Sequence, residues 1–184
     1  MLTSYTSTSL SGENMRYIDD YEVTVIIDSR EKKSSVIAYL EKCNIPYVVE
    51  KLSVGDYSLY LRHKENGTTI HCGNKFALER KASLDEIIQN MARKEHRRRF
   101  INELEHAKSL GTKLEVFIED EQWYSKILSH NYFSKTPIKA IRGYVGYFQQ
   151  EYDFTLTGIA KECSGAYIVD RLIFFAKKFI SSEH

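Results

Sequence analysis

Short apolar runs alternate along the chain with longer stretches in which apolar residues recur at helical spacing. The short runs are rich in β-branched and aromatic residues, which predicts buried or half-buried strands. They are "EVTVIID" (22–28), "YVVEKL" (47–52), "DYSLYLRH" (56–63), "TTIHCGNKFALER" (68–80), "KLEVFIED" (113–120) and "DFTLTG" (153–158). The first run ends in Asp28, which places an acid at the carboxyl end of a strand.

Helical spacing predicts the segments between these strands. Four of the expected helices cover residues 35–43, 122–130, 136–150 and 160–180. Between the first two of these, one helix begins at residue 84 and breaks near Ala92, and another continues from there to Leu110. In the helix that ends at Leu110, the apolar face is formed by Phe100, Ile101, Leu104 and Ala107. Gly111 would be its C-cap. Strands that alternate with helices predict an α/β fold, with a central mixed β-sheet flanked by helices.

The length of 184 residues suits one core, so we expect a single domain over residues 21–184. Residues 1–20 are expected to form a flexible N-terminal tail, because the Ser/Thr-rich start has no periodicity. That start has neither the basic residues nor the apolar core of a signal peptide, and no apolar run approaches membrane-spanning length. The pattern predicts a protein that does not enter a membrane.

The cysteines Cys43, Cys72 and Cys163 are odd in number and match no zinc spacing. We interpret them as buried thiols in a reducing compartment. The expected location is the cytoplasm, in association with the nucleoid if the source is bacterial or a phage.

Charge is informative through its distribution, since the net charge is only +1. The stretch "RKEHRRR", from Arg93 to Arg99, carries five basic residues and one acid. It has two interpretations: a contact for an acidic polymer, or the solvated face of a helix.

A hairpin is predicted at Asn66-Gly67, between two strand-like runs. The second strand of this hairpin would run back beside the first and bring Asp56 and Glu79 together in space. On a strand, Glu79 and Lys81 project from one face and Arg80 from the other. Gly55 would let the chain bend tightly at this edge, although it also fits an ordinary loop.

Local structure offers its own explanation for the acids that follow. "SLDE", from Ser83 to Glu86, has the form of a capping box, with Asp85 and Glu86 in a first turn where the helix dipole favours acids. We assign Glu86 to this role. Asp85 fits it equally well, so any functional role needs another argument.

Carboxylates that converge at one strand edge repel each other unless a cation lies among them. Oxygen ligands favour Mg²⁺ or Mn²⁺, and a lysine beside such an ion can align water and neutralise charge on a phosphate. Asp56, Glu79 and Lys81 therefore form a minimal set for phosphodiester hydrolysis. A surface ion pair between Lys81 and an acid is the simpler alternative for these residues taken alone.

Three motifs in order change that balance: "VIIDSRE" (25–31), "GDY" (55–57) and "ERKASLD" (79–85). Together they resemble the XPF-type structure-specific nuclease domain, a branch of the restriction-endonuclease-like PD-(D/E)XK superfamily. Every charged position of that family's signature is filled. The resemblance extends from about residue 22 to the end and implies a restriction-endonuclease-like fold.

The resemblance also implies roles. Asp56 and Glu79 would be the principal metal ligands, with Asp28 as an additional acid, and Lys81 would position the attacking water. Glu31 and Arg30 complete the first motif, where Arg30 would contact the phosphate or orient carboxylates. Arg80 would anchor its strand by pairing with an acid such as Asp85, which would combine capping with support of the site.

Branched DNA, such as flaps, forks and junctions, is the substrate that the resemblance implies, with Mg²⁺ as cofactor and Mn²⁺ as a substitute. A sequence-independent contact with backbone phosphates is expected from the basic helix. The residues concerned are Arg93, Lys94, Arg97 and Arg98.

The chain departs from the family pattern in one respect: it ends at His184, with too few residues for the tandem helix-hairpin-helix module that often follows the nuclease domain. Junction specificity would then depend on a partner. A homodimer through the nuclease domain is expected, with exposed aromatics of "IRGYVGYFQQEYDF" (141–154) as one candidate surface. Two alternatives stay open: a non-catalytic DNA-binding or scaffold subunit, and a nuclease of the same superfamily without junction preference.

Overall fold

The computed structural model describes residues 17–18, 20–31 and 34–182. Most of the predicted tail, residues 1–20, lies outside these ranges. Within it, Tyr17–Ile18 forms the short strand β1, which pairs antiparallel with β2, Tyr21–Asp28. Ile18 is buried in the core.

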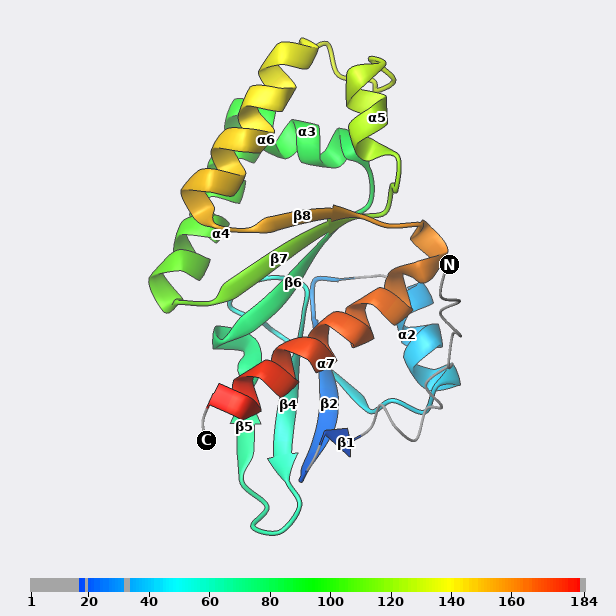
Figure 1. Ribbon diagram of the computed structural model, residues 1–184, viewed down its shortest axis with the longest axis vertical. Helices are drawn as coiled ribbons and strands as arrows, with labels where there is room; N and C mark the ends of the chain where they lie inside the picture. The colour runs from blue at the N-terminus through cyan, green and yellow to red at the C-terminus, as the bar shows by residue number, and fades with distance from the viewer. Residues whose placement is uncertain (1–16, 19, 32–33, 183–184) are drawn as a thin grey trace, which may run out of the picture.

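The strands of the described residues form one mixed sheet (Figure 1). Its order is β1-β2-β4-β6-β7-β8, with β3 beside β2 and β5 beside β4. The remaining strands are β3 (Tyr47–Glu50), β4 (Tyr57–His63), β5 (Thr69–His71), β6 (Phe76–Lys81), β7 (Lys113–Ile118) and β8 (Thr155–Gly158). β6, β7 and β8 are parallel to one another, whereas β4 is antiparallel to both β2 and β6. The predicted α/β fold with a mixed sheet is confirmed.

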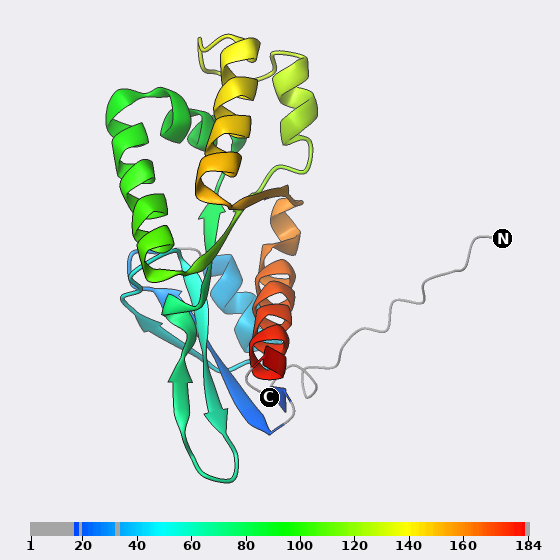
Figure 2. The same ribbon diagram turned by 60° about the vertical axis from the view of Figure 1, so that its left-hand side comes forward.

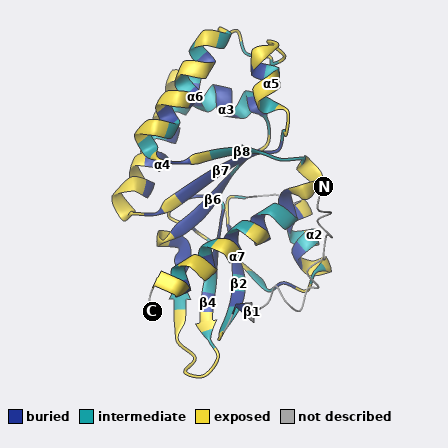
Figure 3. Ribbon diagram, viewed as in Figure 1, coloured by how far each residue is buried: buried dark blue, intermediate teal, exposed yellow. Residues whose placement is uncertain are grey.

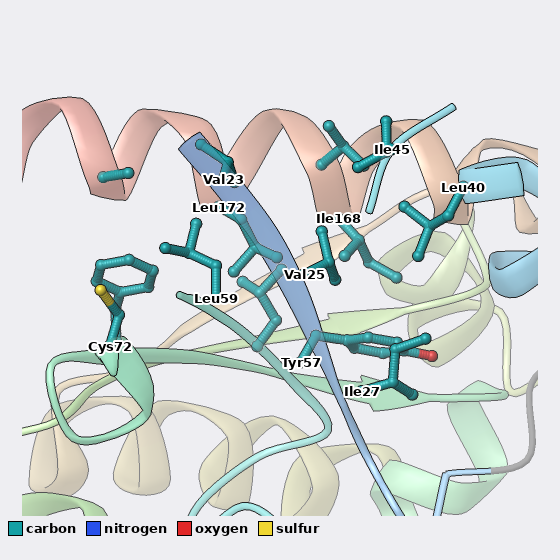
Figure 4. Close-up of a cluster of buried hydrophobic side chains, with 14 of the residues drawn as sticks. Val23, Val25, Ile27, Leu40, Ile45, Tyr57, Leu59, Cys72, Ile168 and Leu172 are labelled. Carbon is teal, nitrogen blue, oxygen red and sulfur yellow. The ribbon is translucent and has the colours of Figure 1, made fainter. Parts of the chain in front are cut away.

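Helices cover both faces of the sheet (Figures 1 and 2). α2 (Ser34–Lys42) and α7 (Ser164–Ser182) lie on one face, where they share a core with the side chains of β2 and β4 (Figure 4). On the other face lie α3 (Leu84–Ala92), α4 (Lys94–Leu110) and α6 (Ile138–Tyr152), with α5 (Trp123–Leu128) beside α6. The strands are mostly buried and the outer sides of the helices exposed, which leaves the strand ends as the places where polar groups can gather (Figure 3).

The helix boundaries follow the predicted signals closely. The break after α3 falls at Arg93, whose backbone is extended, with φ −85° and ψ 127°. Gly111 ends α4 in the left-handed conformation, at φ 66°. Phe100, Leu104 and Ala107 form the buried face of α4, as predicted.

Three details differ from the sequence-based expectation. The run 68–80 is not one strand, because a 3-10 turn at Cys72–Asn74 separates β5 from β6. The last helix begins at Ser164, after a short 3-10 turn at Lys161–Cys163. Only Cys72 is a buried thiol, while Cys43 is partly exposed and Cys163 exposed.

In the part of the chain that the structure describes, no helix combines the length and the apolar character needed to span a bilayer.

Candidate active site

Three strands bring their charged ends to one place. The backbone of Asp28, at the end of β2, donates to the carbonyl of Asp56 at 2.8 Å, and Asp56 donates to the carbonyl of Leu78 in β6 at 2.8 Å. Asp56 and Glu79 are thus close in space, as predicted, but the cause is the pairing of β4 with β6. The predicted hairpin joins β4 to β5 instead.

Gly55 makes this approach possible. Its φ is +71°, and a Cβ atom built on it would lie 2.9 Å from both the Ala77 Cβ and the Leu78 carbonyl oxygen. Because only glycine tolerates both the backbone conformation and the contact, the entry into β4 depends on this residue.

Glu79 and Lys81 project from the same face of β6, as the strand period predicted. The Lys81 Nζ atom lies 2.5 Å from Glu79 Oε1, and both side chains are nearly enclosed, with 6% and 8% of their surface exposed. The ammonium also lies 5.2 Å from the centre of the Phe100 ring in α4. Burial favours the neutral amine, but the adjacent Glu79 carboxylate outweighs it and raises the pKa of Lys81. This lysine is a cation at neutral pH.

Asp56 lies beside this pair with its carboxyl group turned toward the same edge. Its Oδ2 atom accepts a hydrogen bond of 2.8 Å from the backbone N–H of Arg80. Burial, and after it repulsion from Glu79, raise the pKa of Asp56 well above its usual range. The carboxyl is therefore costly to ionise here unless a cation comes close.

A fourth acid, Glu103 of α4, was not among the predicted residues. Its carboxyl lies close enough to the Glu79 carboxyl and to the backbone N–H of Gly55 for both to influence its pKa. Burial, followed by repulsion from Glu79, raises the pKa of Glu103 to about 7. Glu103 is one turn beyond Phe100, so its spacing from the apolar face of α4 was the available signal for a position facing the sheet.

Arg80 points to the opposite face of β6, as predicted, but it does not pair with Asp85. Its guanidinium lies 3.1 Å from Glu31 and 3.2 Å from Glu119, at the end of β7. Glu119 in turn accepts a hydrogen bond of 2.6 Å from Ser164 Oγ of α7. Arg80 thus joins the loop after β2, the end of β7 and α7, and Glu119 is a second residue that the motifs did not indicate.

Asp85 has a different partner from the expected one. Its Oδ1 atom accepts the backbone N–H groups of Phe133 at 2.8 Å and Ser134 at 3.3 Å. The predicted helix start is confirmed, since Ser83 Oγ accepts from the N–H of Glu86 at 3.2 Å. Asp85 therefore anchors the loop between α5 and α6 onto the start of α3.

Asp28 is close to the edge through its backbone, but its carboxylate is already engaged. Oδ1 accepts the Arg30 backbone N–H at 2.8 Å and Nε at 2.7 Å, while Oδ2 accepts Arg30 Nη2 at 3.0 Å and the Leu52 N–H at 2.7 Å. Although burial opposes ionisation, these bonds prevail and hold the pKa of Asp28 below its usual value. This geometry fits orientation of Arg30 better than direct metal ligation.

The donor atoms at this edge fit a hard cation. Asp56, Glu79 and Glu103 offer carboxylate oxygens only, which suits Mg²⁺ or Mn²⁺. Among the described residues, no three or more His, Cys, Asp or Glu side chains form a group that could hold a metal ion by themselves. Since Mg²⁺ keeps several waters and uses one or two carboxylates together with substrate phosphates, this set still fits it.

The basic start of α4 is largely exposed. Arg93, Lys94 and Arg98 face solvent, and Lys94 and Arg98 border a surface hollow. Arg97 is engaged in the fold: it donates to the carbonyls of Met91 at 2.6 Å and Ala92 at 3.0 Å, and it lies 4.7 Å from the centre of the Tyr144 ring. Among the described residues, Arg97 is the one of the four predicted phosphate contacts whose polar groups have protein partners.

Comparison with solved structures supports the fold. XPF from Aeropyrum pernix matches with a TM-score of 0.55 and 15% identity, covering 82% of this chain and 60% of that one. XPF from Aeropyrum pernix in complex with DNA matches with a TM-score of 0.55 and 16% identity, covering 84% of this chain and 65% of that one. The protein thus spans less than two thirds of either chain.

Sequence comparison gives the family. No curated protein matches this sequence. The family model of the ERCC4 domain matches residues 27–168, a range that begins at the end of β2, includes the acids of the strand edge and ends within α7. Since this range is well over half of the chain, the protein belongs to the ERCC4 domain family.

Proposed function

We propose that the protein is a metal-dependent DNA endonuclease that hydrolyses phosphodiester bonds at the edge formed by Asp56, Glu79 and Lys81. One observation carries the proposal: the enclosed Lys81 ammonium lies 2.5 Å from Glu79. Asp56 lies beside this pair, and burial and repulsion from Glu79 raise the pKa of its carboxyl. Acids that repel one another beside a single ammonium gain from an added divalent cation. An ordinary surface ion pair would be exposed and would not have a second carboxyl beside it.

Each residue has a role in this proposal. Mg²⁺, with Mn²⁺ as a substitute, supplies Lewis-acid chemistry at the scissile phosphate. Asp56 and Glu79 hold the cation, and Glu103 lies beside Glu79. Lys81 aligns the attacking water and stabilises charge that develops on the phosphate. The Arg80 pairs with Glu31 and Glu119 keep β6 in register with its neighbours.

Asp28 acts in this proposal by positioning Arg30. The guanidinium is held by two hydrogen bonds to Asp28, yet 65% of the Arg30 side chain is exposed. An oriented, solvent-facing arginine suits a contact with the substrate phosphate.

DNA is the proposed substrate, with flaps, forks or junctions as the preferred structures. One similar solved structure, XPF from Aeropyrum pernix, is a complex with DNA, which supports DNA as a ligand for this fold. Arg93, Lys94 and Arg98 would hold backbone phosphates on the approach to the site. A homodimer through this domain is part of the proposal, and sedimentation velocity measures it.

Two alternatives make different predictions. A scaffold subunit would bind the same DNA without cutting, but the acids expected of an active member are all present. A nuclease without junction preference would cut plain duplex or single strands as fast as flaps.

The test is cleavage of labelled 3′-flap, fork, nicked and plain duplex DNA in Mg²⁺, Mn²⁺ or EDTA, by the wild type and by Lys81→Ala. We expect metal-dependent cutting, fastest on branched DNA, that Lys81→Ala lowers by about a thousandfold. Equal rates on all substrates would favour the second alternative. Binding without cutting in every metal would favour a scaffold.

A further inference from the structure

The stretch from Gln122 to Gln150 contains no Asp or Glu, yet it contains Lys126, Lys135, Lys139 and Arg142. At the average acidic content of the chain, a stretch of this length would carry about four acids. It covers α5, α6 and the loop between them, at the top of the molecule in Figure 1. This part of the molecule is therefore selectively positive although the protein is nearly neutral.

The cations there are free for a ligand, with one exception. Lys126 pairs with Asp120 at 2.7 Å. Among the described residues, none forms an ion pair with the exposed side chains of Lys135, Lys139 or Arg142. Three cations without a protein partner can neutralise an external anion without first breaking an ion pair.

Aromatic side chains stand among these cations. Phe133 is 97% exposed, Tyr147 56% and Tyr124 46%. A fully exposed phenylalanine costs free energy in water, and large exposed apolar groups within a polar surround mark binding sites.

The loop that carries Phe133 is held in place. Asp85 accepts the Phe133 N–H at 2.8 Å. Tyr132 donates its hydroxyl to the Thr136 carbonyl at 3.0 Å, and the hydroxyls of Ser134 and Thr136 lie 2.9 Å apart. A ring presented by a preorganised loop loses little conformational entropy on binding.

α5 and α6 also enclose a surface groove. Tyr124 of α5 and Lys139, Arg142, Gly143, Gly146 and Gln149 of α6 line it. Apart from adjacent residues and the backbone of α6 itself, no heavy atom of the described residues lies within 4 Å of a Cβ built on Gly143 or Gly146. A ligand could therefore approach the helix backbone between the two cations and the tyrosine.

We infer that this α5–α6 surface, defined as the groove together with Phe133 and Lys135, binds single-stranded DNA. Lys139 and Arg142 contact the phosphates, while Tyr124 and Phe133 stack on unpaired bases. Stacking on aromatic side chains needs bases that are not already stacked in a duplex, and aromatics interleaved with cations are the pattern that single strands require. The surface is distinct from the basic start of α4 and rests on the proposed function only for DNA as the ligand.

Fluorescence anisotropy of a labelled oligo-thymidine strand in EDTA tests the inference without cleavage. For the double variant Lys139→Ala/Arg142→Ala we expect a Kd about tenfold higher. The slope of log K against log salt should shrink by about 1.4, since each single-strand phosphate contact contributes roughly 0.7. Phe133→Ala should raise the Kd about tenfold with an unchanged salt slope, because stacking releases no counterions.

The matched control is Lys177→Ala/Lys178→Ala, which removes the same charge from exposed positions of α7, on the other face of the sheet (Figure 1). Its Kd should stay within about twofold of the wild type. An equal loss of affinity in the control, or wild-type affinity in both test variants, would overturn the inference. So would variants that convert a dimer to a monomer in sedimentation velocity while their DNA affinity is unchanged, because the surface would then serve a second copy.

The outcome is separable from the proposed function. A wild type that cuts no DNA but loses single-strand affinity through these substitutions leaves the inference standing. Conversely, a wild type that cuts DNA in Mg²⁺ while these substitutions leave its single-strand affinity unchanged would support the proposed function and overturn the inference.

Discussion

Gly55 is the residue on which the position of Asp56 depends. An alanine there would combine an unfavourable φ of +71° with contacts of 2.9 Å to two groups, one of them a backbone carbonyl that cannot move aside. We expect Gly55→Ala to lower the free energy of unfolding by about 2–3 kcal/mol in urea denaturation.

Gly111→Ala provides the control. Its φ is +66°, but apart from its two chain neighbours no heavy atom of the described residues lies within 4 Å of an added Cβ. Only the backbone strain remains, so the loss should be about 1 kcal/mol. Equal losses for the two variants would show that the close approach at Gly55 is unimportant.

Glu103 should make stability depend on pH in the absence of metal. Its pKa rises from 4.5 to about 7 on folding, so between these values the folded protein binds more protons than the unfolded chain. Stability contributed by this group is present below pH 4.5 and is lost as the pH rises through 7. In EDTA at a pH above that window, Glu103→Gln should be more stable than the wild type by about 1–2 kcal/mol.

The measurement is urea denaturation of both proteins across that pH window. The difference between wild type and Glu103→Gln isolates this residue from Asp56, whose pKa is also raised. Parallel pH profiles for the two proteins would contradict the placement of Glu103 beside Glu79.

At this scale the sequence predicts best what depends on neighbouring residues. The strand period alone places Glu79 and Lys81 together and Arg80 opposite them. Glu103 and Glu119 escaped prediction because their positions depend on how α4 lies on the sheet and where β7 ends. The engagement of Asp28 by Arg30 could not be read from the motif, since it requires the fold of the loop after β2.

At the scale of elements, Asp85 links α3 to the loop between α5 and α6. Asp85→Ala should speed amide exchange at Phe133 and Ser134 by at least about tenfold and cost about 1 kcal/mol, because two backbone donors lose their acceptor. Asp85→Asn keeps an acceptor oxygen and should have a smaller effect. DNA cleavage should fall less than about tenfold, since Asp85 does not contact Arg80 or the metal edge. A loss of cleavage as complete as that of Lys81→Ala would refute this structural role.

Element prediction succeeded where a local signal was strong. The Asn66-Gly67 turn, the helix stop at Gly111 and the helix start at Ser83 are each specified by one or two residues. The break at Cys72–Asn74 was missed because "CGN" lies between two β-like runs, and the turn there is closed by the His71 side chain accepting the Gly73 N–H. A side-chain contact of this kind is invisible to periodicity.

At the scale of the whole molecule, the strand order places the end of β2, the start of β4 and the end of β6 at one edge. The predicted hairpin at Asn66-Gly67 brought only Asp56 and Glu79 together, and the family resemblance added Asp28. The strand order itself was not predicted, because it is not encoded in local pattern.

The most direct test of the account is the single-turnover cleavage rate of a flap substrate in Mg²⁺ for wild type and Asp56→Asn, with DNA affinity measured in EDTA. The substitution is nearly isosteric and keeps an oxygen to accept from the Arg80 N–H. We predict a rate lower by about a thousandfold or more at unchanged affinity, because a metal ligand is lost while the DNA contacts remain. An Asp56→Asn protein that cuts within about tenfold of the wild-type rate would contradict the assignment of this edge as the active site.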